Sequence, residues 1–241
     1  MASASPEARR LAWACAAMGG RLEGNASLPQ TMTFCGAATD SREVKPGRLF
    51  FALPGERVDG FDFCAKAVAA GAAAVVVDGS RGRPLGCEGV PVIGVQNPRR
   101  ALGDLASSVR SRFKGRVVGI TGSNGKTTTK ELIAAALTVG GSVLRTHGNL
   151  NTDVGLPLTM LESTGSEDFW VLEMAMRGRG EIAYLSALSQ PHLGVITNVA
   201  GAHLERLGSI AEVARAKGEL FHGLKDDGLA VFPADEPPTL L

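Results

Sequence analysis

Short apolar runs along the chain alternate with segments in which apolar residues recur every three or four positions. The runs are bounded by glycine, proline or charged residues and predict buried strands, whereas the longer repeat predicts helices that bury one face. In the C-terminal part this alternation is regular, which is typical of a mainly parallel sheet covered by helices on both faces. The strands predicted there are 117–121, 142–144, 169–174, 193–197 and 229–232.

The N-terminal part of the chain predicts a smaller α/β domain. A helix is expected over 61–70, where Gly71 ends the repeat of apolar residues. A second helix is expected from Pro98 to near Arg112, and it connects this domain to the next. We therefore predict an N-terminal domain over 1–97 and a central domain over 98–241. The strands predicted in the N-terminal domain are 48–53, 73–77 and 92–95.

A glycine-rich turn, 119–131 (GITGSNGKTTTKE), joins the first central strand to a helix. Glycines let the backbone curl around an anion so that successive N–H groups point at it, and the helix N-terminus adds positive potential. Lys126 can then reach the outer phosphates of a nucleotide, and the Thr127 hydroxyl can bind a Mg²⁺ that bridges them. The predicted nucleotide-binding residues are Gly122, Ser123, Asn124, Gly125, Lys126, Thr127 and Thr128.

The alternative is an ordinary glycine-rich turn between a strand and a helix. The usual phosphate-loop spacing has a glycine at the position that Ile120 occupies here. A lysine followed by three threonines at a helix start has no obvious packing purpose, which favours the phosphate loop. The helix itself is expected to bury the face that carries Leu132, Ile133, Ala136 and Leu137.

Three further polar residues stand where they could take part in chemistry. Glu173 ends a predicted apolar strand and could hold Mg²⁺ beside the phosphate loop, or it could simply face solvent. His203 follows the strand 193–197 within a few residues and could be structural or catalytic. Lys217 lies on the apolar face of a helix predicted over 209–221. A charged lysine there is costly, so its ammonium reaches the rim, or the amine is modified or works in the site.

The composition argues against several classes of function. The 241 residues carry a formal net charge of +1 and 5% aromatic residues, which argues against nucleic acid or an anionic membrane as a partner. No apolar run approaches the roughly 20 residues that cross a bilayer, so we expect a cytoplasmic protein. The four cysteines form no C-x-x-C pair, which favours buried reduced thiols over a metal cluster or disulfides.

Several stretches match the motifs of one enzyme family. They are 40–42 (DSR), 44–55 (VKPGRLFFALPG), 121–128 (TGSNGKTT), 148–157 (GNLNTDVGLP), 173–176 (EMAM), 198–205 (NVAGAHLE) and 214–219 (ARAKGE). Together they resemble the Mur ligases, the ATP-dependent amide-bond enzymes of cell-wall precursor synthesis. The stretches from 148 onward are closest to the member that adds D-alanyl-D-alanine to UDP-N-acetylmuramoyl-tripeptide. Thr152 departs from that pattern, in which asparagine is usual.

This resemblance implies a reaction that uses ATP and Mg²⁺. ATP would phosphorylate the terminal carboxylate of the peptide, and the amine of the dipeptide would then attack the acyl phosphate to give an amide and phosphate. The implied partners are these small-molecule substrates. Neither nucleic acid nor membrane insertion is expected, and the protein is expected to be a monomer. The fold implied is a small uridine-nucleotide domain followed by a phosphate-loop ATPase domain.

The resemblance also implies roles for individual residues. Lys217 matches a lysine that is carbamylated in the family, which would turn a buried cation into a metal-binding carboxylate-like group. The catalytic residues would be Lys126, His203 and Lys217, and the metal ligands Thr127, Glu173, His203 and Lys217. The substrate-binding residues would be Asp40, Ser41 and Arg42 near the uridine, and Asn149 and Asn151 near the sugar and peptide.

Members of this family continue well beyond the length of this chain. We therefore expect an incomplete central domain, no C-terminal domain, apolar surface exposed at a sheet edge, and no turnover by the chain alone. Two other functions stay open: the neighbouring ligase that adds a diamino acid at the third position, and a non-catalytic nucleotide-binding fragment. A regulatory GTPase is disfavoured because the Asn-Lys-x-Asp guanine signature is missing.

Overall fold

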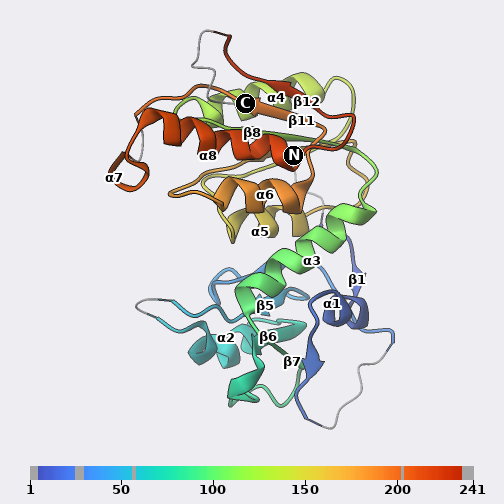
Figure 1. The fold of residues 1–241 in the computed structure, drawn as a ribbon. Coiled ribbons are helices and arrows are strands. Elements are labelled where there is room, and N and C mark those ends of the chain that lie inside the picture. The colour runs from blue at the N-terminus through green and yellow to red at the C-terminus, as the bar shows by residue number, and fades with distance from the viewer. Residues whose placement is uncertain (1–4, 25–29, 56–57, 202–203, 235–241) are drawn as a thin grey trace. The chain divides into compact units, whose positions relative to one another are not determined.

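The computed structural model describes residues 5–24, 30–55, 58–201 and 204–234, and its contacts divide the chain into two compact units (Figure 1). The first unit consists of Met1–Val109 with Met160–Gly165, and the second of Arg110–Thr159 with Ser166–Leu241. Both are mixed α/β structures with largely parallel sheets, which confirms the predicted fold class. The functional boundary between 97 and 98 stays a prediction, since the two units divide inside the helix α3, Pro98–Arg112.

The first unit is built on a five-stranded sheet of order β2-β7-β6-β5-β4. Only β2 runs antiparallel to its neighbour, and a separate pair, β1 and β3, lies outside this sheet. The strands are β1 Arg9–Arg10, β2 Arg21–Leu22, β3 Thr33–Phe34, β4 Ala37–Ala38, β5 Leu49–Phe51, β6 Ala74–Asp78 and β7 Val92–Val95. The helices are α1 Leu11–Ala17, η1 Gly60–Phe63, α2 Cys64–Ala69, η2 Gly79–Arg81 and α3.

Local capping explains how the predicted helix 61–70 begins. The Asp59 carboxylate accepts a hydrogen bond from the Phe61 N–H (2.9 Å), and a 3₁₀ turn, η1, then leads into α2. Cys64 of α2 and Cys87 are both buried in the same apolar cluster. Burial raises the pKa of the Cys64 thiol to about 12, and all four cysteines are free, as predicted.

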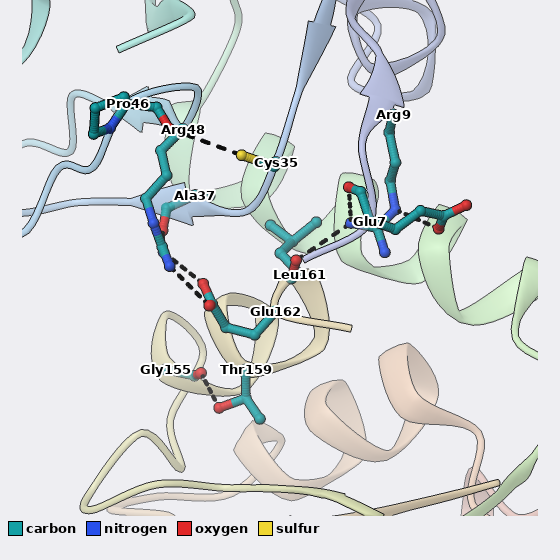
Figure 2. A network of polar contacts seen from close by, with 10 residues as sticks. All are labelled: Glu7, Arg9, Cys35, Ala37, Pro46, Arg48, Gly155, Thr159, Leu161 and Glu162. Carbon is teal, nitrogen blue, oxygen red and sulfur yellow. Dashed lines mark hydrogen bonds and ion pairs between the residues drawn. The ribbon is translucent and has the colours of Figure 1, made fainter. Parts of the chain in front are cut away.

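Residues 160–165 reach the first unit from a later part of the chain, and two arginines hold them there. The Arg48 guanidinium donates to both carboxylate oxygens of Glu162, one of them at 2.8 Å, and to the Ala37 carbonyl at 2.7 Å. Arg9 is buried and donates to the carbonyls of Ser163 (2.7 Å) and Leu161 (3.3 Å). Figure 2 shows the Arg48 guanidinium turned toward the Glu162 carboxylate.

The second unit is built on a fully parallel sheet of order β12-β11-β8-β10-β9. Figure 1 shows α4 on one side of these strands and α6 and α8 on the other. The strands are β8 Arg116–Thr121, β9 Val143–Arg145, β10 Phe169–Glu173, β11 Leu193–Ile196 and β12 Leu229–Val231. The helices are α4 Lys126–Leu137, α5 Gly155–Leu161, α6 Glu181–Ser189, α7 Leu204–Leu207 and α8 Ile210–His222.

The face that α4 buries differs from the predicted one. Leu132 is 67% exposed and Ala136 is also exposed, so the prediction that these residues face the core is wrong. The inward face instead carries Lys130 and Ala134, flanked by the half-buried Ile133 and Leu137. Because a lysine begins this inward stripe, a search for apolar residues at helical spacing selects a face rotated away from the buried one, and only Ile133 and Leu137 of the predicted residues pack against the core.

One edge of the second sheet exposes apolar side chains, as expected. Within the described ranges, the edge strand β12 pairs only with β11, and Leu229 (67%), Val231 (50%) and the following Phe232 (37%) are exposed. Among the described residues, none of the helices has the length and apolar character needed to span a membrane.

The ion pair between Arg48 and Glu162 should contribute measurably to stability. Replacing Arg48 by Met keeps the apolar stem but leaves the carboxylate and the Ala37 carbonyl without their donor. We expect the first unit to lose about 2 kcal/mol of unfolding free energy. Urea unfolding followed by the fluorescence of Trp13, with Trp170→Phe in every variant, measures this unit.

The matched control is Arg42→Met. Arg42 pairs with Asp40 on the surface and its side chain is 84% exposed, so solvent screens the pair. This control should leave the urea midpoint unchanged within error. Equal losses for the two variants would contradict the importance of the Arg48 contact.

The stability of the second unit should depend on the protonation of His192. The Nδ1 atom of His192 accepts the Val117 N–H (3.0 Å), and the pKa of His192 is lowered, first by burial and then by Arg110 and Arg116. A lowered folded-state pKa means that the neutral form stabilises the fold. This stability is fully present above the unfolded pKa of about 6.5 and is lost as pH falls through the folded pKa.

Urea unfolding followed by Trp170, with Trp13→Phe, tests this between about pH 8 and about pH 5. His192→Gln keeps a polar side chain that does not titrate, so it should lose less stability over this interval than the parent. An identical loss in both proteins would show that other groups cause the pH dependence.

Candidate functional site

The predicted phosphate loop follows β8 at the carboxyl end of the parallel sheet and leads directly into α4. Gly122 has a φ of 152° and Gly125 a φ of 77°, conformations that residues with side chains rarely adopt. A Cβ atom on Gly122 would overlap the Thr197 hydroxyl, whereas on Gly125 it would meet no described atom within 4 Å. Gly122 is therefore required by close packing, and Gly125 by the direction in which the chain enters the helix.

Lys126 is the first residue of α4, and its side chain folds back over the loop. The ammonium donates hydrogen bonds to the carbonyl oxygens of Gly122 (2.7 Å) and Ser123 (3.2 Å). Burial lowers the pKa of Lys126, and the Glu173 carboxylate opposes that shift. The ammonium thus lies beside the free N–H groups at the start of α4, which together are donors for an anion.

The segment after β11 holds the loop in place. The Asn198 side-chain oxygen accepts the Asn124 N–H (2.9 Å), and its carbonyl accepts the Ser123 N–H (3.0 Å). The Ser123 hydroxyl accepts the Ala200 N–H (2.9 Å), and the Thr197 hydroxyl donates to the Asn124 carbonyl (2.6 Å). The sequence analysis did not select Thr197 or Asn198, although both directly follow the strand next to β8.

Glu173 ends β10 and faces the interior at 2% exposure, which rules out the solvent-facing alternative. One carboxylate oxygen accepts the Thr127 hydroxyl (2.9 Å), and the other accepts the Asn151 side-chain amide (2.8 Å). The structure therefore brings together three residues that the sequence analysis selected separately. It also keeps a carboxylate and a hydroxyl side by side at the end of the phosphate loop.

Lys217 lies on the buried face of α8, as predicted, and is 2% exposed, so its ammonium does not reach the rim. Burial, and to a smaller extent the charge of Lys126, lowers the pKa of Lys217 to about 8. Within the described part of the chain, no hydrogen bond or ion pair to the Lys217 ammonium is present. The Glu219 carboxylate fixes α8 by accepting the Gly180 N–H (2.8 Å) and the Ala183 N–H (3.1 Å) at the start of α6.

The remaining predicted residues lie elsewhere or outside the described part. His203 lies outside the described residues, and Thr128 and Asn149 are exposed. Asp40, Ser41 and Arg42 belong to the first unit. There Arg42 donates to both carboxylate oxygens of Asp40, and these bonds lower the pKa of Asp40 to about 2.

The residues present fit a Mg²⁺ ion that arrives with a nucleotide. A hydroxyl and a carboxylate are oxygen ligands of the kind that Mg²⁺ prefers, and phosphate oxygens and water usually complete its shell. Within the described ranges, no group of three or more histidine, cysteine, aspartate or glutamate side chains could hold a metal ion. Thr127 and Glu173 thus suit a metal site whose other ligands are phosphate oxygens and water, rather than one in which the protein supplies all the ligands.

Comparison with family models is decisive for the family. Residues 120–240 match the model described as Mur ligase middle domain, and residues 33–110 match the one described as Mur ligase family, catalytic domain. This chain belongs to the Mur ligase family. The match to the middle-domain model contains the phosphate loop, Glu173 and Lys217. The match to the other model contains Asp40–Arg42.

Curated Mur ligases with similar sequences share one name, UDP-N-acetylmuramoyl-tripeptide--D-alanyl-D-alanine ligase. The protein from Escherichia coli is 45% identical over 204 residues, which are 85% of this chain and 44% of the relative. The protein from Bacillus subtilis is 45% identical over 202 residues, 84% of this chain and 44% of the relative. The chain therefore spans less than half the length of these curated relatives.

Solved structures give the same result. MurF from Acinetobacter baumannii superposes with a TM-score of 0.88 at 34% identity, covering 97% of this chain and 50% of that protein. MurF ligase from Thermotoga maritima, solved in complex with ADP, has a TM-score of 0.76 at 36% identity, covering 84% of this chain and 46% of that protein.

The two glycines of the loop should respond differently to a methyl group. Gly122→Ala forces an overlap with Thr197 in addition to a strained φ, so we expect a loss of about 3 kcal/mol of unfolding free energy. Gly125→Ala meets only the backbone strain, about 1 kcal/mol. Urea unfolding followed by Trp170, with Trp13→Phe, compares them, and equal losses would refute the close packing of Gly122.

Proposed function

We propose that this chain is the uridine-substrate and nucleotide-binding part of an ATP-dependent ligase that joins D-alanyl-D-alanine to UDP-N-acetylmuramoyl-tripeptide. The observation that carries the proposal is the contact between Thr127 and Glu173 at the end of the phosphate loop. A hydroxyl beside a carboxylate supports a site for a phosphate-bound metal. A monomer is proposed with it, since both groups come from one compact unit. Action in the cytoplasm is proposed from the similarity to the curated ligases.

Nucleotide binding is supported by three features of one short segment. The α4 N-terminus offers free N–H donors, the glycines allow a close approach, and Lys126 adds a positive charge. In the reaction Lys126 would stabilise the charge that develops on the transferred phosphoryl group. The relative from Thermotoga maritima, which superposes on this chain with a TM-score of 0.76, was solved in complex with ADP.

Thr127 and Glu173 would hold Mg²⁺, with Glu173 acting directly or through water. The metal, when bound, would neutralise phosphate charge and align the outer phosphate for transfer. Asn151 would keep the Glu173 side chain in position through its 2.8 Å hydrogen bond. His203 is proposed as a further ligand from the family resemblance.

Lys217 is proposed to be carbamylated, as the matching lysine is in the family. The support is physical as well: Lys217 is buried, its pKa is lowered to about 8, and it lies near another ammonium. A lowered pKa gives a larger fraction of neutral amine, the form that reacts with carbon dioxide. The product would be an anion, which would remove the repulsion from Lys126 and supply an oxygen ligand for metal.

Two groups of residues that match the family motifs are proposed to bind parts of the substrate. Asp40, Ser41 and Arg42 would lie near the uridine, and Asn149 and Asn151 near the sugar and peptide. The Arg42–Asp40 pair is preformed, so its exposed guanidinium has a fixed direction for binding an oxygen of the substrate.

Nucleotide affinity tests the phosphate loop directly. Lys126→Met removes the charge and keeps most of the side-chain volume, so ADP affinity measured by calorimetry with Mg²⁺ should fall about 30-fold. Lys114→Met, at an exposed position outside the loop, should leave it unchanged. Unaltered ADP affinity in Lys126→Met would remove the basis of the proposal.

Acceptor choice tests the reaction. A polypeptide that carries these 241 residues together with the additional part of its relatives should consume ATP only when tripeptide precursor and D-alanyl-D-alanine are both present. Product mass identifies the new amide bond. Activity with a dipeptide precursor and a diamino acid would instead favour the neighbouring ligase, and ATP binding without any acyl phosphate would favour a non-catalytic module.

A further inference from the structure

Lys130 is a buried lysine one turn beyond Lys126, and neither the sequence motifs nor the proposed mechanism uses it. Its side chain is 1% exposed. The ammonium donates to the Thr146 carbonyl (2.7 Å), pairs with Glu131 (3.1 Å) and lies 4.0 Å from a Glu173 carboxylate oxygen. Burying an ammonium is costly, so these contacts must offset a large desolvation penalty.

Of the two contacts between Lys130 and a carboxylate, burial strengthens the one with Glu173. Glu131 is half exposed and also pairs with Arg145 (2.9 Å), so water and a second cation weaken its attraction for Lys130. Glu173 and Lys130 are both almost fully buried, where a charge pair is screened much less. Lys130 is thus a close cation for a carboxylate that has little water around it.

Thr146 links the same two residues through the backbone. Its carbonyl accepts the Lys130 ammonium, while its hydroxyl accepts the Glu173 N–H at 3.0 Å. Thr146 is fully buried and its own N–H donates to Val171 of β10. Lys130 therefore acts on Glu173 both by charge and by fixing the residue that holds the Glu173 backbone.

We propose that Lys130 is a positioning residue that holds the Glu173 carboxylate toward Thr127 and thereby sets how strongly the pair binds a nucleotide-bound divalent cation. The inference rests on the proposed function of that pair. Without Lys130, Lys126 remains as a cation that interacts with this carboxylate, and a Glu173–Lys126 pair would withdraw both groups from the nucleotide.

The measurement is the ratio of ADP affinity with Mg²⁺ to ADP affinity in EDTA, on the 241-residue chain. Lys130→Met should reduce this ratio about 10-fold, the size expected when a residue that orients a metal ligand is removed. Affinity in EDTA should change much less. Lys114→Met is the matched control on the surface and should leave the ratio unchanged.

A double-mutant cycle with Glu173→Gln separates positioning from general loss of structure. If Lys130 acts through Glu173, Lys130→Met should not lower the ratio further in the Glu173→Gln background. Independent reductions that multiply would overturn the inference. Lys130→Gln, which can still donate to Thr146 but carries no charge, serves if Lys130→Met does not fold, and it should also lower the ratio.

The two proposals fail in different ways. If Mg²⁺ does not strengthen ADP binding to the parent chain, the proposed function of Thr127 and Glu173 fails. If Mg²⁺ strengthens binding in the parent and equally in Lys130→Met, the site stands and the positioning role of Lys130 is wrong.

Discussion

A buried carboxylate must be paired or hydrogen-bonded, and the second unit is arranged around that requirement at Glu173. Its partners come from three separate segments: Thr127 and Lys130 from α4, Asn151 from the loop before α5, and Thr146 from the end of β9. They meet because β10 lies between β8 and β9 in the sheet. The strand order thus creates the site, since parallel strands bring their carboxyl ends to one edge.

Much of this arrangement can be predicted from sequence because it follows local rules. The order of an apolar strand, a glycine-rich turn and a helix predicted the phosphate loop. The end of an apolar run predicted the position of Glu173. The helix α6 could not be found in this way, because its buried residues Ile182, Leu185, Ser186, Leu188 and Ser189 leave no polar face and hence no helical repeat. The orientation of α4 was mispredicted for a related reason, since a paired lysine occupies a position that periodicity reserves for an apolar residue.

Three lysines near the phosphate loop differ in how far their roles can be predicted from the sequence. Lys126 was selected by its motif and Lys217 by its place on an apolar face, but Lys130 has no such signal. Its role depends on a glutamate that is distant in sequence and on the carbonyl of Thr146, and neither is visible without the sheet register.

The placement of residues 160–165 in the first unit has a consequence for biosynthesis. A ribosome releases residues 1–109 well before the segment whose Glu162 and Ser163 occupy Arg48 and Arg9. The nascent first unit must therefore keep two guanidinium groups without these acceptors until β8, α4 and β9 have been translated. The first unit therefore acquires its last contacts only after part of the second unit has been synthesised.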